Sequence, residues 1–154
     1  MEPVLWDAPL SGAEQLAAVL DHSGVDYRRD GDEFRFVFSS RGCRWQMIGR
    51  GEGERVLLYA IHPTPVTDRH SALELCSYIN SMAVEGSCFL QDQRIVFRTQ
   101  AKLIEACAAR EMVLQALEYS ASVMTFFWGD MVRGANGLSL QQSMDAMRSR
   151  FGDT

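Results

Sequence analysis

A chain of 154 residues with 47% hydrophobic side chains has the size of one domain and enough apolar surface for a packed core, which argues against a disordered protein. The formal charge of −5 argues against a dedicated nucleic-acid binder, because phosphate contacts require a basic surface. The longest apolar run, residues 56–61, is too short for a membrane-spanning helix, and the N-terminus does not resemble a secretion signal. We therefore expect a cytoplasmic protein with no nucleic-acid and no membrane partner.

The first predicted helix begins at Ser11. Ser11 and Glu14 fit a capping box, in which the hydroxyl accepts a hydrogen bond from a free amide while the acid reaches back to the chain. Leu16 and Leu20 follow at helical spacing, and Gly24 ends the segment. This pattern predicts an amphipathic helix with one buried face.

Three strands are predicted next, because the hydrophobic period changes to two. EFRFVFS (residues 33–39) and CRWQMI (43–48) alternate between apolar and polar side chains, as strands with one buried face do. VLLYAI (56–61) is apolar throughout, which is typical of a central strand. The chain turns after Ser40 and again in GRGEGER (49–55), so the three strands form a meander.

A second helix and a hairpin are predicted after this meander. The helix has a capping box at Ser71 and Glu74 and runs to about Ala83. Residues 87–91 and 94–99 then form two short strands around a polar turn.

The remaining sequence is predicted to be helical. A long helix over residues 103–133 carries a continuous apolar stripe. A short amphipathic helix follows over residues 139–151, with a third capping box at Ser139 and Gln142.

The predicted fold class is α+β, in the order α-β-β-β-α-β-β-α, with a five-stranded antiparallel sheet packed by helices and an extra C-terminal helix. The predicted organisation is an N-terminal extension (residues 1–10), one domain (11–134) and a C-terminal tail with the short amphipathic helix (135–154).

One face of the sheet is a candidate partner-binding surface. If Phe34, Phe36 and Phe38 point towards the helices, the opposite face gathers arginines around the apolar centre of the strand at residues 56–61. Such a face suits a protein or peptide with acidic and hydrophobic residues, although a one-sided antiparallel sheet wetted by its arginines is the preferred interpretation from the residues alone. The candidate residues are Arg35, Arg44, Gln46, Leu57, Tyr59, Arg94 and Arg98.

The long helix carries a second candidate surface. Its apolar stripe is wider than contact with one sheet requires, and methionine-rich surfaces adapt to varied partners. Core packing or a homodimer seam is preferred here over a site for a different partner. The stripe residues are Val123, Met124, Phe127, Trp128 and Met131.

No residue is predicted to be catalytic. Cys88, in a Gly-Ser-Cys triplet, is the candidate nucleophile, but no motif places a histidine beside it, and His70 lies at the far end of the preceding helix. A packing role for this cysteine is preferred. The four cysteines are scattered, with no CxxC and no metal-ligand spacing, so neither a metal site nor a disulfide framework is expected.

Two polar stretches also receive structural interpretations. The glycines of residues 49–53 could suggest a phosphate loop, but a strand follows them, and Glu52 and Glu54 would repel phosphate. A hairpin loop is therefore predicted there. A solvated loop, in preference to an acid–base pair or cation site, is predicted for the acids Asp26, Asp30, Asp32 and Glu33.

The order of elements resembles type III secretion chaperones and the YbjN-type family of bacterial sensory transduction regulators. The local likeness is LCSYINSMAVEGSCFLQDQRIVFRTQ (residues 75–100), with an Asn-containing helix end, a short strand, a polar turn and a second strand. The resemblance spans about residues 10–134; the tail helix departs from it, as does Phe127-Trp128-Gly129-Asp130 in place of an aspartate-rich helix ending. It implies a secretion-chaperone-like fold and a non-enzymatic, often dimeric protein that binds other proteins, with no catalytic residues to carry over.

The sequence thus leads to the hypothesis of a protein-binding module that needs no cofactor and captures another protein or peptide as a homodimer. Capture would use main-chain pairing at an exposed strand edge or side-chain insertion on the arginine-rimmed face. The alternatives are a dedicated chaperone of a secreted substrate, a small cysteine-dependent or metal-assisted enzyme, and a structural subunit of a larger assembly.

Overall fold

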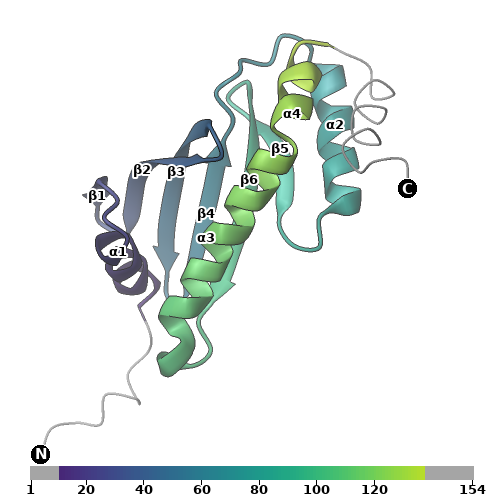
Figure 1. Ribbon diagram of the computed structural model, residues 1–154. Coiled ribbons are helices and arrows are strands. Elements are labelled where there is room, and N and C mark those ends of the chain that lie inside the picture. Colours follow the sequence, from purple (N-terminus) through teal and green to yellow (C-terminus); the bar gives the residue numbers. More distant parts are fainter. Residues whose placement is uncertain (1–10, 138–154) are drawn as a thin grey trace, which may run out of the picture.

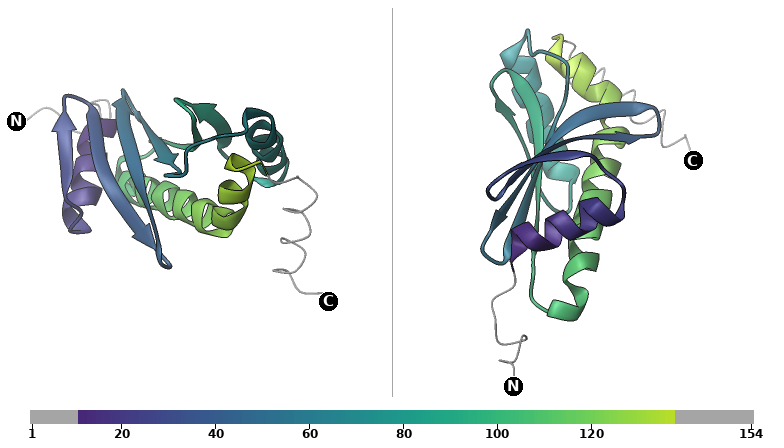
Figure 2. Two further views of the ribbon diagram at one scale, coloured as in Figure 1. Left: turned by 90° about the horizontal axis from the view of Figure 1, so that it is seen from above. Right: turned by 90° about the vertical axis from the view of Figure 1, so that its left-hand side faces the viewer.

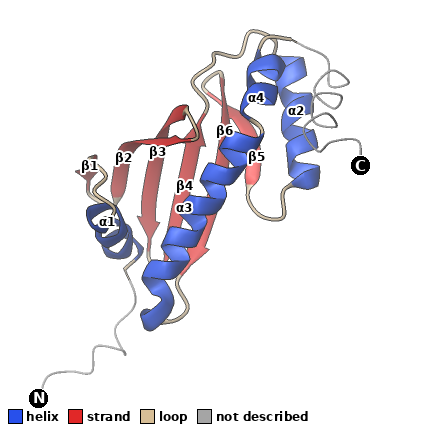
Figure 3. Ribbon diagram, viewed as in Figure 1, coloured by secondary structure: helices blue, strands red, loops and turns tan. Residues whose placement is uncertain are grey.

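The computed structural model describes residues 11–137, so the predicted N-terminal extension and tail helix lie outside the described residues. Six antiparallel strands form one sheet in the order β1-β2-β3-β4-β6-β5 (Figures 1 and 3). Within residues 11–137, no helix is long and apolar enough to cross a membrane. The strands are β1 (Tyr27–Asp30), β2 (Glu33–Ser40), β3 (Cys43–Glu52), β4 (Arg55–Ile61), β5 (Ser87–Gln91) and β6 (Arg94–Lys102).

The helices lie on one side of this sheet and leave the other side uncovered by the described chain (Figure 2). α1 packs on β3, α3 crosses β6 and β4, and α2 packs on α4 and β5. The elements are α1 (Gly12–His22), α2 (Arg69–Met82), the short 3-10 helix η2 (Ala106–Ala108), α3 (Ala109–Phe126) and α4 (Trp128–Ala135).

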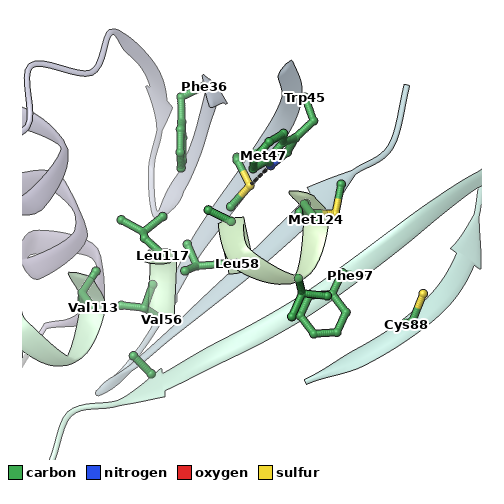
Figure 4. Close-up of a cluster of buried hydrophobic side chains, with 14 of the residues drawn as sticks. Phe36, Trp45, Met47, Val56, Leu58, Cys88, Phe97, Val113, Leu117 and Met124 are labelled. Atoms are coloured by element: carbon green, nitrogen blue, oxygen red, sulfur yellow. Dashed lines mark hydrogen bonds between the residues drawn. The ribbon is translucent and has the colours of Figure 1, made fainter. Parts of the chain in front are cut away.

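The hydrophobic core fills the space between the inner sheet face and the helices (Figure 4). Alternate residues of β4 and β6, such as Leu58 and Phe97, have no exposed surface, because successive side chains of a strand point to opposite faces. Met124 of α3 is equally buried. The indole Nε1 of Trp45 donates a hydrogen bond to the sulfur of Met47 at 3.0 Å, so the one polar group of this large side chain has a partner inside the core.

Two glycines of β3 explain why α1 lies so close to the sheet. A side chain at Gly51 would place its Cβ 2.3 Å from the backbone nitrogen of Ala13, and one at Gly49 would lie 2.6 Å from a methyl carbon of Leu16. The predicted loop over residues 49–55 is therefore mostly wrong. β3 runs to Glu52, and the glycines in it permit a close helix approach, one of the roles of glycine inside strands.

The prediction of five strands is wrong by one. The acidic stretch interpreted as a loop contains β1, which pairs with β2 from Tyr27↔Phe36 to Asp30↔Glu33. All but Tyr27 of its four residues are exposed, and hence it shows no hydrophobic alternation. β1 is held by its pairing with β2 and by hydrogen bonds from Tyr27 and Arg29 to side chains of α1, and the sequence of the strand alone reveals neither.

Helix boundaries also differ from the predicted ones. Ser11 caps α1 as expected, its hydroxyl accepting from the Glu14 amide at 3.2 Å. The cap of α2, however, is Asp68, whose carboxylate accepts from the Ser71 amide at 3.0 Å. The long helix is broken at Phe127 into α3 and α4, so the chain changes direction where a single helix was predicted.

Candidate functional site: the outer face of the sheet

The outer face of the sheet carries the opposite set of alternating residues. On β4, Leu57, Tyr59 and Ile61 are half-buried, whereas their neighbours on the inner face are fully buried. Basic side chains dominate this face although the chain as a whole has a formal charge of −5. The outward charged residues of β2, β3, β4 and β6 are the basic Arg35, Arg44, Arg50, Arg55, Arg94, Arg98 and Lys102 and the acidic Glu33 and Glu52.

A depression of about 510 Å³ lies in the middle of this face, and we call it the central depression. The strand register builds it in rows: Arg35 lies opposite Ile48, Ile48 opposite Tyr59, and Tyr59 opposite Arg98. A second row brings Ile61, Val96 and Phe89 together. The lining residues are Glu33, Arg35, Ile48, Arg50, Tyr59, Ile61, Phe89, Gln91, Asp92, Arg94, Val96 and Arg98.

The floor of the central depression is apolar. Val96 is only 2% exposed although it points away from the helices, so its neighbours on the outer face must cover it. Phe89 is half-buried beside it, directly across the β5–β6 pair. An apolar floor of this kind gains free energy when a partner removes it from water.

The arginines around this floor differ in whether a carboxylate neutralises their charge. Glu33 contacts Arg35 at 3.3 Å and Arg50 at 3.4 Å, both as partly exposed ion pairs. Within residues 11–137, no carboxylate lies within ion-pair distance of Arg94 or Arg98. The Arg98 guanidinium instead lies 5.8 Å from the centre of the Phe89 ring. This side of the rim thus keeps guanidinium groups available for an anionic partner.

The central depression contains part of the predicted set. Arg35, Tyr59, Arg94 and Arg98 line it, whereas Arg44, Gln46 and Leu57 lie on the same face outside it. Sequence reasoning did not select Ile48, Arg50, Phe89 and Val96. The alternation of β3 and β6 would have placed Ile48, Arg50 and Val96 on the outer face. The alternation of the short strand β5 would have placed Phe89 there as well.

The apolar stripe of the long helix packs inside the molecule. Met124 and Met131 have no exposed surface, and Val123 and Phe127 are also buried. Trp128 is half-buried, its ring centre 5.8 Å from that of Trp45. The break at Phe127 lets α3 and α4 bury different parts of the stripe. These residues therefore belong to the core and offer no continuous surface to a partner.

Cys88 has the surroundings of a structural cysteine. Its sulfur lies 3.4 Å from that of Cys76, and both side chains are buried. The hydrogen bond with Cys76, together with burial, raises the pKa of the Cys88 thiol and keeps it protonated. Within the described residues, no histidine hydrogen-bonds a cysteine, and no three ligand-type side chains form a metal-binding group.

His62 is enclosed at the end of β4 and has no exposed surface. Its ring centre lies 4.2 Å from that of Trp128, and its Nδ1 accepts a hydrogen bond from the Thr64 amide at 3.2 Å. Burial lowers the pKa of His62 to about 4, and the Trp128 backbone offsets part of this effect. The imidazole is thus neutral and serves packing on the helical side of the sheet.

Comparison with known proteins identifies the family of this chain. Residues 12–127 match the model of YbjN, described as a putative bacterial sensory transduction regulator. The fold is similar to the crystal structure of YbjN, a putative transcription regulator from E. coli, with 16% sequence identity and a TM-score of 0.52 over 76% of this chain and 91% of that chain. No curated protein matches the sequence. Since the family match covers most of the chain, this protein belongs to the YbjN family.

Proposed function

We propose that this protein is a non-enzymatic binding module that captures another protein through the central depression. A regulatory family description is in keeping with binding in place of turnover. The helices use the inner face for the core, so the outer face is the broad sheet surface left for a partner. The mechanism is insertion of apolar partner side chains over Val96 and Phe89, with partner carboxylates held by the arginine rim.

The observation that carries this proposal is the pairing of an apolar floor with unneutralised arginines. A wetted structural sheet face needs neither a half-buried Phe89 nor arginines without carboxylate partners. Arginine binds carboxylates bidentately, so Arg94 and Arg98 can orient an acidic partner as well as attract it.

The homodimer implied by the family resemblance is part of the proposal. Its interface must lie away from the helix stripe, because Met124 and Met131 are buried within one copy of the chain. Sedimentation equilibrium of the purified protein tests the homodimer. A monomer mass at high concentration would exclude the homodimer but would not bear on binding at the central depression.

The experiment for the central depression compares two charge reversals on the same face. The tagged protein is purified from its native host, the attached proteins are identified, and the affinity for the purified partner is measured. Arg98→Glu changes the rim, whereas Arg55→Glu makes the same charge change on β4 outside the central depression. We expect Arg98→Glu to weaken binding about tenfold or more and Arg55→Glu to weaken it far less.

Melting temperatures provide the folding control, since both arginines are exposed and both variants should unfold near the wild-type temperature. Equal affinities for the wild type and Arg98→Glu would show that the partner does not use the central depression. Equal losses in both variants would show only a general charge effect.

A further inference from the structure

The two edges of the sheet are protected to different extents. At the β5 edge, the side-chain amide of Asn80 donates to the carbonyl of Cys88 at 2.9 Å and accepts from its amide at 2.7 Å. This pair of hydrogen bonds occupies the main chain that an added strand would need. α2 thereby closes this edge, a common protection against unwanted strand pairing.

The opposite edge is open over half of β2. Pairing with β1 ends at Tyr27↔Phe36, but β2 continues for residues 37–40, and these pair only with β3. Ser40 and Cys43 close a tight two-residue turn, so alternation directs the amide and carbonyl of Ser39 away from β3. Ser39 is exposed, and Val37 is 43% exposed. We call residues 37–40 the open edge; it lies between the start of β1, at Tyr27, and the β2–β3 turn (Figure 1).

Two depressions flank the open edge, one on each side of the sheet. The outer one, of about 730 Å³, includes Arg28, Arg35 and Arg44 in its lining. The inner one, of about 690 Å³, lies between Phe38 of β2 and Ala121 and Phe126 of α3. An added strand directs alternate side chains to the two sides, so each depression would receive every second residue.

The chemistry of the two depressions differs. The outer lining has three arginines and one acid, Asp26, and therefore favours carboxylates. Aromatic and aliphatic carbons of Phe38, Ala121 and Phe126 lie in the inner lining, where Arg41 and Glu118 oppose each other in charge. This asymmetry selects an extended segment with acidic residues on one side and apolar residues on the other.

We propose that the open edge is a second docking site, at which an extended segment of another protein adds as a strand beside β2, with its acidic side chains on the arginines and its apolar side chains against Phe38 and Ala121. Main-chain hydrogen bonds to Ser39 hold the strand, and the two depressions set its register. The site shares only Arg35 with the central depression, so binding at the open edge can be tested separately from the proposed function.

A synthetic peptide tests the site directly. The probe is a fluorescently labelled ten-residue peptide of alternating valine and glutamate with blocked ends, and the matched probe is alternating valine and lysine. Binding is followed by fluorescence anisotropy, and amide hydrogen exchange of Ser39 is measured by NMR with and without peptide. We expect the glutamate peptide to bind, the lysine peptide not to bind, and exchange at Ser39 to slow at saturation.

Three variants locate the binding. Ser39→Pro removes an amide that faces away from β3, so the hairpin remains paired while strand addition is blocked. We expect Ser39→Pro and Arg44→Glu each to weaken the glutamate peptide about tenfold, and Arg98→Glu to leave it nearly unchanged.

Unchanged exchange at Ser39, or equal binding of the lysine peptide, would overturn the open-edge site. A loss with Arg98→Glu but not with Ser39→Pro would place the peptide in the central depression, which ends this inference and supports the proposed function. A dimer mass that falls to a monomer in Ser39→Pro would assign the open edge to a second copy of the chain and also end the inference. The exchange measurement uses the wild type, so the test holds even if Ser39→Pro does not fold.

Discussion

The inner and outer faces of the sheet are made from alternate residues of the same strands, yet they have different environments. On β4, Leu58 is completely buried beneath the helices, while its neighbour Leu57 is only half-buried. On β6, Phe97 packs in the core, while Arg98 is exposed and free of ion pairs with carboxylates among the described residues. The comparison teaches that the inner face supplies most of the buried core, whereas the apolar side chains of the outer face, apart from Val96, remain partly exposed.

The same comparison applies to charge. Arg35, Arg50 and Arg98 point outward, and the inner positions beside them are apolar, glycine or, in the case of Thr99, a buried neutral side chain. Because an unpaired charge is expensive to bury, the helical side fixes which side chains of each strand can be arginine. The charged residues of these strands therefore lie on the outer face, and because most of them are basic, this face attracts anions although the chain as a whole is acidic.

The largest effect we expect separates the two faces on one strand. Leu58→Ala leaves a cavity under α1 and α3 and should lower the free energy of unfolding by about 3 kcal/mol. Leu57→Ala removes the same atoms from a half-buried position and should cost about 1 kcal/mol or less. Urea denaturation of both variants measures the difference. Equal losses would mean that the outer face contributes to the core as strongly as the inner one.

This division between the faces was predictable from the sequence, because a period of two needs only the strand's own residues. Phe34 and Phe36 point inward and Arg35 outward, as predicted. The family resemblance was equally accessible: Asn80, in the quoted stretch, lies at the helix end and holds the first strand of the following hairpin.

Features that depend on tertiary contact were not predictable in the same way. β1 lacks an apolar face, so only its pairing with β2 reveals it. Gly49 and Gly51 were interpreted as turn residues because the close approach of α1 leaves no local mark in the sequence. The break at Phe127 has no proline, and it arises where α4 packs against α2.

The candidate site was only partly predictable for a related reason. Alternation identifies the face of Tyr59 and Arg98 but not the register between strands, which decides the lining of a depression. The register places Ile48 between Arg35 and Tyr59, while Arg44 lies near the open edge.

A smaller effect concerns the titratable group enclosed on the helical side. Burial lowers the pKa of His62 from 6.5 to about 4, so the unfolded chain binds the proton more readily than the folded chain. Stability is therefore complete above about pH 6.5 and is lost as the pH falls towards 4. The free energy of unfolding should be about 2 kcal/mol lower at pH 5 than at pH 7.

Two variants isolate this effect from general acid destabilisation. His62→Phe keeps an aromatic ring beside Trp128 and should flatten the pH dependence between 5 and 7, by about the amount attributed to His62. His22→Asn changes an exposed histidine of α1 and should leave the pH dependence nearly as in the wild type. If the profile of His62→Phe matches that of the wild type, the enclosed imidazole is not the group that titrates.

The smallest expected effect on stability comes from removing an acidic side chain of the outer face, where the earlier charge-reversal variants remove basic ones. Glu33→Gln removes the carboxylate that contacts Arg35 and Arg50, and partly exposed ion pairs of this kind contribute about 1 kcal/mol or less. The same change makes the rim of the central depression more basic, so an acidic partner should bind more tightly, and added salt should reduce the gain. Titration of the purified partner at low and high salt measures both. Glu33→Gln should therefore change binding more than stability, because the two arginines that Glu33 contacts lie on the outer face of the sheet and outside the core.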